Sequence, residues 1–246
     1  MKQKISRYLY RFVLFLVRVF SPRMQVQGLE NLPDEPCIIA ANHSQMYGPI
    51  ACEIDLPFNR YTWCAGEMMK LKEVPAYAYR DFWSGKPKCI RWFYKIASYV
   101  IAPLAVLVFN NAQTIPVYRD ARILSTFRST MEKLQQGAHA VIFPECYDSY
   151  NQIICRFQEG FVNVARLYYR KTGKALSFVP MYIAPKLKKM ILGVPLIFDP
   201  EAPYDQECMR ICNHLMQEIT RIAVSLPRHI VVPYANIPKK DYPTNI

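Results

Sequence analysis

Four short apolar runs constrain the fold of this chain more than any other feature of its sequence. The runs are CIIAA (37–41), TIPVY (114–118), AVIF (140–143) and FVPMYI (178–183). Each is bounded by turn or polar residues, which is typical of buried strands. Apolar residues recur at helical spacing over 123–136, 161–169 and 206–226. Strands that alternate with helices predict an α/β fold, with a mostly parallel central sheet flanked by helices.

The charge of the chain narrows the choice of partners. The 246 residues include 31 Lys and Arg against 19 Asp and Glu, a formal net charge of +12, and 52% of them are hydrophobic. This composition excludes a disordered chain, and the basic charge suits nucleic acid or an anionic membrane surface. The sequence carries no recognised nucleic-acid-binding motif, and its aromatic residues cluster in apolar runs rather than along a basic stripe. We therefore expect no nucleic acid as a partner, and an anionic membrane surface stays open at this point.

The cysteines favour a reducing interior. All eight are scattered, and none forms a CxxC pair, which argues against a zinc ribbon and a thioredoxin-like motif. Cys208, Cys212 and His214 lie close together in a helical pattern. No second group of ligands completes a tetrahedral site there, so we expect no metal.

Residues 1–23 are apolar, aromatic and basic at once. Arg11 and Arg18 interrupt the apolar stretch, whereas a membrane-spanning helix needs about twenty mostly uncharged residues. Basic and aromatic residues together suit an amphipathic helix that lies in the membrane interface. A helix packed on the protein's own core is the alternative.

Residues 24–226 are predicted to form one α/β domain that carries an apolar insert at 77–111. The most apolar part of this insert, 96–109, contains Pro103 and is too short to span a membrane comfortably. The segment 96–109 could form either a buried helix or a shallow hairpin that dips into the membrane.

Residues 227–246 are rich in proline and lysine, which indicates an extended tail over the surface.

Polar residues that could take part in catalysis or binding follow three of the predicted strands. The segments are Asn42-His43-Ser44, Arg119-Asp120 and Pro144-Glu145-Cys146-Tyr147-Asp148. If the strands are parallel neighbours, their carboxyl ends meet at one edge of the sheet, which would bring His43, Arg119 and Glu145 to one cleft. A neutral imidazole accepts a proton from a hydroxyl group, and a guanidinium holds a phosphate. This set suits transfer onto a hydroxyl of a phosphate-bearing acceptor.

The order of these segments resembles the lysophospholipid and 1-acylglycerol-3-phosphate acyltransferase family. The matching segments are VQGLENLP (26–33), IIAANHS (38–44), IPVYRD (115–120), VIFPE (141–145), RFQEGFVNVA (156–165), FVPMYI (178–183) and LGVPLIF (192–198). The resemblance implies a glycerol-phosphate acyltransferase-like fold and transfer of a fatty acyl group from acyl-CoA or acyl-carrier protein, with no further cofactor. It also implies association with the cytoplasmic face of a membrane.

The resemblance further implies roles for individual residues. His43 is the general base, Arg119 binds the acceptor phosphate, and Glu145 organises the loop or contacts substrate. Further substrate contacts are expected from the neighbours of these residues, namely Asn42, Ser44, Cys146 and Tyr147. Cys146 is also a candidate nucleophile, although a packing or loop role suits it better.

The sequence departs from the family pattern beside the general base. The family has an Asp five positions after its His, and this chain has Gly48 there. After Phe-Pro-Glu the family continues with Gly, whereas this chain continues with Cys146, Tyr147 and Asp148. Asp148 is therefore a candidate replacement partner for His43. Other candidates with no better claim are Tyr47, Glu53, Asp55 and Glu67.

Two functions fit this pattern. The first is an active acyltransferase with His43 as base, and the second is a catalytically impaired relative that binds lipid or acyl thioester at the membrane. A carboxylate within hydrogen-bond reach of the far ring nitrogen of His43 favours the enzyme. An apolar cage around a lone His43 favours the binding protein.

Overall fold

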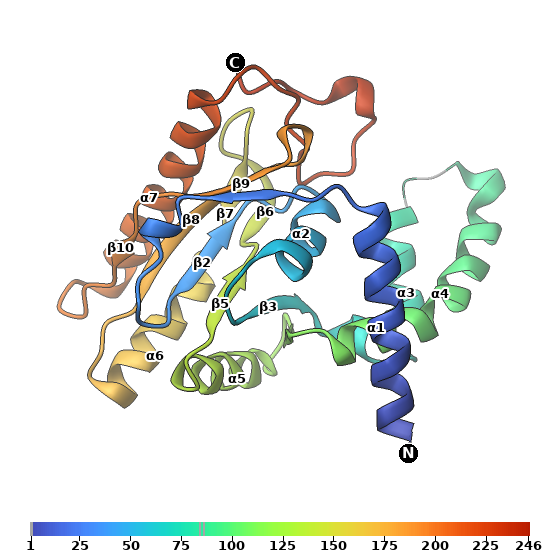
Figure 1. Cartoon of the computed structure of the whole chain (residues 1–246), viewed down its shortest axis with the longest axis horizontal. Helices are drawn as coiled ribbons and strands as arrows, with labels where there is room; N and C mark the ends of the chain where they lie inside the picture. The colour runs from blue at the N-terminus through green and yellow to red at the C-terminus, as the bar shows by residue number, and fades with distance from the viewer. Residues whose placement is uncertain (1, 84, 86) are drawn as a thin grey trace. The chain divides into compact units, whose positions relative to one another are not determined.

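The computed structural model describes residues 2–83, 85 and 87–246 (Figure 1). The chain divides into two compact units. One unit comprises the residues up to Pro22 together with Trp63–Thr126, and the other comprises Arg23–Thr62 and Phe127–Ile246. Strand β3 (Arg60–Ala65) and helix α5 (Ile123–Gln135) run from one unit into the other. Residue 1 of the predicted N-terminal helix segment and residues 84 and 86 of the predicted insert lie outside the described residues.

The larger unit contains the α/β fold. Its strands are β1 (Gln25–Gln27), β2 (Ile38–Ala41), β5 (His139–Ile142), β6 (Glu145–Ser149), β7 (Cys155–Phe157), β8 (Ser177–Ala184), β9 (Lys189–Leu192) and β10 (Leu196–Ile197). Its α-helices are α2 (Tyr47–Asp55), α6 (Asn163–Thr172), α7 (Tyr204–Ser225) and most of α5. Short helical turns are η1 (Leu29–Asn31), η5 (Glu159–Val162), η6 (Pro185–Leu187) and η7 (Lys239–Asp241).

The central sheet is mostly parallel, which confirms the predicted fold class. Its strand order is β1-β9-β8-β2-β5-β3-β4, with β10 paired to β8. Strand β2 is parallel to both β5 and β8, and β3 is parallel to β5. Only β9 and β10 run antiparallel to their neighbour β8 among the pairings described. All four residues of β2 are buried, as expected for a strand covered on both faces.

Alternating side chains of the sheet pack against different layers. On one face, Ile39 and Val179 join a core cluster with Ala51 and Cys52 of α2. On the other face, the ring of Phe178 contacts that of Phe161 at 5.8 Å, and α7 packs against β8. The buried residues of α7 recur at helical spacing and include Cys208, Ile211, Cys212, Leu215 and Ile219. These two layers hold the strand ends described below in place.

The smaller unit is mainly helical. Its elements are α1 (Lys2–Phe20), η2 (Gly66–Met69), α3 (Val74–Ala78), η3 (Tyr79–Trp83), η4 (Lys88–Ile90), α4 (Arg91–Asn111) and β4 (Thr114–Val117). Its core is small and centres on Met68, Val74, Ala78 and Ala102. Helices α1 and α4 pack together, and the side-chain amide of Asn111 donates to the Ser6 hydroxyl at 2.8 Å.

Helix α4 corrects the predictions for 96–109. The segment is neither a hairpin nor a buried helix, because it belongs to one continuous helix in which only Ser98 and Ala102 are buried. The helix begins at Arg91, upstream of the run used for the prediction. With the turn before it, Lys88–Asn111 forms a helix long and apolar enough to cross a membrane by length and composition, and 17% of its most apolar window is buried.

The remaining predictions of local structure agree with the elements observed. The four predicted strands are β2, β4, β5 and β8, each within one residue at its ends. The three helical patterns become α5, α6 and α7, although residues 161–162 belong to η5 rather than to α6. The structure also places α1 and the 77–111 insert in one unit, a grouping that the sequence pattern did not predict.

Candidate active site

The loop after β2 is tied firmly to β8. The Asn42 side chain accepts a hydrogen bond from the Ile183 backbone N–H at 2.7 Å and donates to the Ile183 carbonyl at 3.0 Å. It also donates to the Ser44 hydroxyl at 2.9 Å. Both side chains are buried, and their polar atoms are engaged within the protein. In this structure Asn42 and Ser44 fix the loop that carries His43, and their predicted substrate contacts stay a prediction.

Glu145 joins the His43 loop to the β6–β7 hairpin. One carboxylate oxygen accepts the backbone N–H of His43 at 2.5 Å, and the other accepts that of Cys155 at 2.9 Å. Burial raises the pKa of Glu145 to about 7, while the two N–H donors act in the opposite direction. The structure thus brings Glu145 and His43 together, as their positions after β5 and β2 predict. Glu145 reaches the backbone of His43, not its ring.

The imidazole of His43 lies between aromatic rings. Its centroid is 5.0 Å from that of Phe143 and 5.7 Å from that of Tyr234. Nδ1 is buried and has no hydrogen-bond partner among the described residues, although the residue as a whole is partly exposed. Burial lowers the pKa of His43, partly offset by backbone groups of Gln45 and of His43 itself. The ring is therefore neutral near pH 7.

Gly48 occupies the position where the family pattern has Asp, and the backbone leaves no room for a side chain there. A Cβ atom at Gly48 would lie 2.3 Å from the His43 carbonyl oxygen and 3.1 Å from the Phe143 ring. The loop reaches this conformation through Ser44 and Gln45, whose φ angles are 47° and 53°. Such left-handed conformations are uncommon outside glycine. The loop therefore accepts no side chain at position 48 unless its backbone shifts.

Asp148 makes no described contact with the His43 ring, and two other candidates in the same unit, Glu53 and Asp55, have other described partners. Asp148 is exposed, and its described contact is with the Cys146 thiol at 3.9 Å. Glu53 pairs with Arg60 at 3.2 Å. Asp55 accepts the backbone N–H of Met24 at 3.0 Å. The proposed replacement of the missing Asp by Asp148 thus gains no support from this geometry.

Tyr147 and Cys146 lie on β6 beside the aromatic cluster. Tyr147 is 73% exposed, and its ring centroid lies 5.2 Å from that of Tyr234. Cys146 is half-buried and makes no described contact with His43. No described contact thus supports Cys–His nucleophilic chemistry, which needs the two side chains within hydrogen-bond distance.

Arg119 belongs to the smaller unit, so its predicted convergence with His43 stays a prediction. It follows β4, is exposed, and makes no hydrogen bond or ion pair with any residue that the structure describes. Its neighbours differ, because Asp120 and Arg122 form an ion pair at 2.7 Å. The guanidinium of Arg119 therefore has its donors available for an anionic group.

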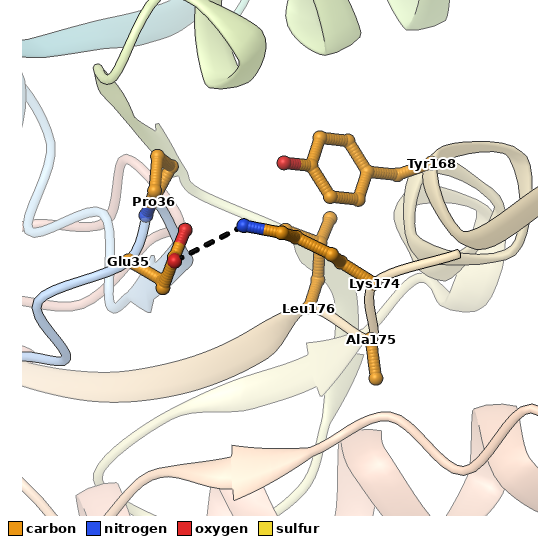
Figure 2. A pocket seen from close by; sticks show the side chains of 6 residues that line it. All are labelled: Glu35, Pro36, Tyr168, Lys174, Ala175 and Leu176. Atoms are coloured by element: carbon orange, nitrogen blue, oxygen red, sulfur yellow. Dashed lines mark hydrogen bonds and ion pairs between the residues drawn. The ribbon is translucent and has the colours of Figure 1, made fainter. Parts of the chain in front are cut away.

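The pocket in Figure 2 lies at the opposite end of the strands from His43. It is lined by Glu35, Pro36, Tyr168, Lys174, Ala175 and Leu176. These residues precede β2 and β8 or belong to α6, and Lys174 pairs with Glu35 at 3.1 Å. Within residues 2–83, 85 and 87–246, no three His, Cys, Asp or Glu side chains are grouped as metal ligands. The described chemistry therefore centres on His43.

Three features of the site were missed from the sequence. Tyr234 packs on the imidazole, the Gln45 side chain bonds Tyr242, and Gly48 packs against a carbonyl. Contacts across about 190 residues leave no local pattern in a single sequence. The glycine was noticed only as a missing carboxylate, although glycine also signals a close approach of backbone.

A family model described as Acyltransferase matches residues 23–184. The crystal structure of the 1-acyl-sn-glycerophosphate (LPA) acyltransferase PlsC from Thermotoga maritima is 14% identical, with a TM-score of 0.45, covering 90% of this chain and 83% of that one. No curated protein sequence matches the chain.

Proposed function

The chain belongs to the acyltransferase family, and we propose that it moves a fatty acyl group from an acyl thioester to the hydroxyl group of a lysophospholipid or glycerol-phosphate-like acceptor. Acyl-CoA and acyl-carrier protein are the candidate donors. The observation that carries the proposal is His43, a partly exposed and neutral imidazole at the carboxyl end of β2. Working residues in parallel α/β sheets gather at this edge.

The proposed reaction is a general-base acyl transfer. Nε2 of His43 removes the proton of the acceptor hydroxyl as its oxygen attacks the thioester carbonyl carbon. The carbon–sulfur bond then breaks, and the imidazolium returns the proton to the departing thiolate. A pKa lowered by burial keeps the base unprotonated near pH 7. Glu145 supports the reaction by holding the His43 backbone.

Arg119 is the proposed contact for the acceptor phosphate. It keeps the position that the family motif gives it, and it is exposed without an ion-pair partner among the described residues. A guanidinium binds phosphate through two parallel hydrogen bonds. No metal is needed for this step as proposed.

We further propose that the protein works on an anionic membrane surface at its cytoplasmic face. Helices α1 and α4 expose large apolar side chains, among them Phe12, Phe15, Trp92, Tyr99 and Val100. Helix α1 also carries Lys4, Arg7, Arg11 and Arg18. Apolar side chains with basic neighbours bind membranes that contain anionic lipids, where lysophospholipid acceptors reside.

A specific observation favours a second candidate, a relative that binds lipid or acyl thioester without transferring it. Nδ1 of His43 is buried among aromatic rings and has no carboxylate partner in the described chain. In a serine protease, loss of the equivalent carboxylate lowers turnover about 10⁴-fold. This apolar surrounding is the arrangement that favours a binding protein over an enzyme.

One experiment separates the two candidates. The purified full chain is mixed with anionic vesicles, radiolabelled acyl-CoA or acyl-carrier protein, and a panel of lysophospholipids and glycerol 3-phosphate. We expect labelled diacyl or monoacyl product from the unmodified protein and from His214→Ala, a control on α7, and none from His43→Ala. Vesicle binding and acyl-CoA binding without product from any acceptor would contradict the enzyme and support the binding protein.

A further inference from the structure

The C-terminal segment, residues 227–246, forms a closed loop rather than an open tail. The His229 backbone N–H donates to the Asn245 side chain at 2.8 Å, and the Asn245 backbone N–H donates back to the His229 carbonyl at 3.2 Å. The Val231 N–H donates to the Pro243 carbonyl at 2.9 Å. Its two ends are therefore joined, which corrects the prediction of a simple extended tail.

The base of this loop is anchored to the α/β unit. The Asn245 amide donates to the carbonyl oxygens of Ala223 and Leu226 at the end of α7, at 2.8 and 3.2 Å. The His229 ring lies within 2.8 Å of the Tyr182 hydroxyl. Both Asn245 and His229 are buried. Fully bonded buried polar groups of this kind hold a segment in one conformation.

The far part of the loop reaches the His43 site. The Tyr234 ring meets the imidazole edge-on, with an angle of 71° between the two planes. Beside it, the Gln45 side chain donates to the Tyr242 hydroxyl at 2.9 Å and to the Ala235 carbonyl at 3.4 Å. Tyr147 contacts the Tyr234 ring. The C-terminal segment, seen in red in Figure 1, thus supplies an aromatic neighbour of the candidate base.

The orientation of the His43 ring depends on its neighbours because its buried Nδ1 makes no hydrogen bond in the described chain. Nδ1 has no partner in the described chain, and the backbone excludes a carboxylate side chain at Gly48. The orientation of the imidazole then depends on the packing of Phe143 and Tyr234. Edge-to-face ring pairs have a preferred geometry, so two of them restrict rotation of the ring.

We propose that Tyr234 is a positioning residue for His43, and that the C-terminal segment is the part of the site that replaces the missing aspartate in orienting the imidazole. This inference rests on the proposed function for its kinetic consequence, but the ring contact itself is independent of it. The groups that face the imidazole are Phe143 and Tyr234, with Glu145 on its backbone and Tyr147 behind Tyr234. Asp148 makes no described contact with it.

The first test reads His43 directly and needs no substrate. The full chain is labelled with ¹³C-histidine, its four histidines are followed by NMR during a pH titration, and the His43 signal is identified as the one absent from His43→Ala. We expect Tyr234→Ala to raise the His43 titration midpoint toward about 6.5, and Tyr234→Phe to leave it unchanged. Ile237→Ala, an exposed position in the same loop, is the matched control.

The second test measures catalysis in the same variants. We expect Tyr234→Ala to lower kcat about 10- to 100-fold with little change in KM, the size of loss that misplacing a catalytic group causes. Tyr234→Phe should recover most of the rate. The variant Tyr234→Leu keeps apolar volume and replaces Tyr234→Ala if the latter fails to fold.

The two tests can contradict the positioning role and the proposed function independently of each other. A His43 titration in Tyr234→Ala and Tyr234→Leu that matches the Ile237→Ala control overturns the positioning role, whatever the activity. A shifted titration supports it even if the unmodified protein transfers no acyl group, in which case only the proposed function fails. A kcat loss shared equally by Ile237→Ala would indicate a general effect of the loop and contradict a role specific to Tyr234.

Discussion

His43 and His229 lie in two regions of the same unit. Their surroundings are similar, but the hydrogen bonding of their ring nitrogens differs. Both imidazoles lie beside a tyrosine contributed by a distant part of the chain, Tyr234 and Tyr182 respectively. Both ring nitrogens of His229 lie 2.8 Å from oxygen atoms, those of Tyr182 and Pro227. Nδ1 of His43, in contrast, is buried and has no hydrogen-bond partner in the described chain. A histidine that completes its hydrogen bonds within the protein stabilises a fold, whereas a partly exposed one with incomplete hydrogen bonding is available to another molecule.

Exchanging the two histidines for alanine should give opposite results, and this is the largest effect we expect. His43→Ala should lower acyl transfer about 10³-fold, within the range for loss of a general base, with little change in the unfolding free energy. His229→Ala should lower the transfer rate per folded molecule far less than His43→Ala does, and it should lower the unfolding free energy by about 2–4 kcal/mol, because it leaves the Tyr182 hydroxyl and Pro227 carbonyl unpaired. Radiometric transfer assays and urea unfolding provide the two measurements. Equal loss of stability in both variants would remove the contrast.

Restoring the family's carboxylate at position 48 should not give His43 the hydrogen-bond partner that its Nδ1 lacks. In Gly48→Asp the new Cβ would meet the His43 carbonyl at 2.3 Å, so α2 or the loop must shift. We expect a loss of about 3 kcal/mol, as in overpacked cores, and no gain in acyl transfer. Thermal unfolding and the transfer assay test this, with Gly85→Asp, where a Cβ meets no atom within 4 Å, as control. A gain in transfer would show that the loop accepts the family geometry.

The unfolding free energy should fall as pH rises through the range in which Glu145 ionises. Burial raises the pKa of Glu145 from 4.5 to about 7, so the folded protein holds this proton when the unfolded chain has lost it. Stability from this group is complete below pH 4.5 and falls as pH rises to about 7. Relative to Glu145→Gln, the unmodified protein should lose at most about 3 kcal/mol across this window, at about 1.4 kcal/mol per pH unit.

Urea unfolding at several pH values measures the Glu145 effect. Glu159→Gln is the control, because Glu159 is exposed. A difference between the unmodified protein and Glu145→Gln that stays constant from pH 4.5 to pH 8 would contradict the raised pKa. It would mean that the two backbone N–H donors outweigh burial.

The smallest effect should come from the hydrogen bond between the His43 loop and the C-terminal segment. Tyr242→Phe removes the hydroxyl that accepts the Gln45 amide at 2.9 Å and keeps the ring. We expect a loss of about 1 kcal/mol, the usual net value of one hydrogen bond, and a change in acyl transfer of less than about threefold. Tyr47→Phe, at an exposed position, is the control for loss of a hydroxyl.

Local sequence patterns predicted the strands and the edge of the sheet at which the site residues lie. The apolar runs located β2, β5 and β8, and the parallel-sheet rule correctly brought Glu145 and His43 to one edge. Exposure of α4 was not predictable, because an apolar sequence looks the same whether protein or lipid is to cover it. The contact of Tyr234 with His43 was not predictable either, since distant loops carry no periodicity that records their partner.

The long separation between Gln45 and Ala235, 190 residues, also has a consequence during synthesis. A ribosome that adds about 5–20 residues per second would need roughly 10 to 40 s to proceed from the His43 loop to the segment that packs on it. Throughout that interval the nascent chain carries an imidazole without its second aromatic neighbour. The candidate base is thus assembled late in translation, after the apolar helices α1 and α4 have already left the ribosome and are free to meet a membrane.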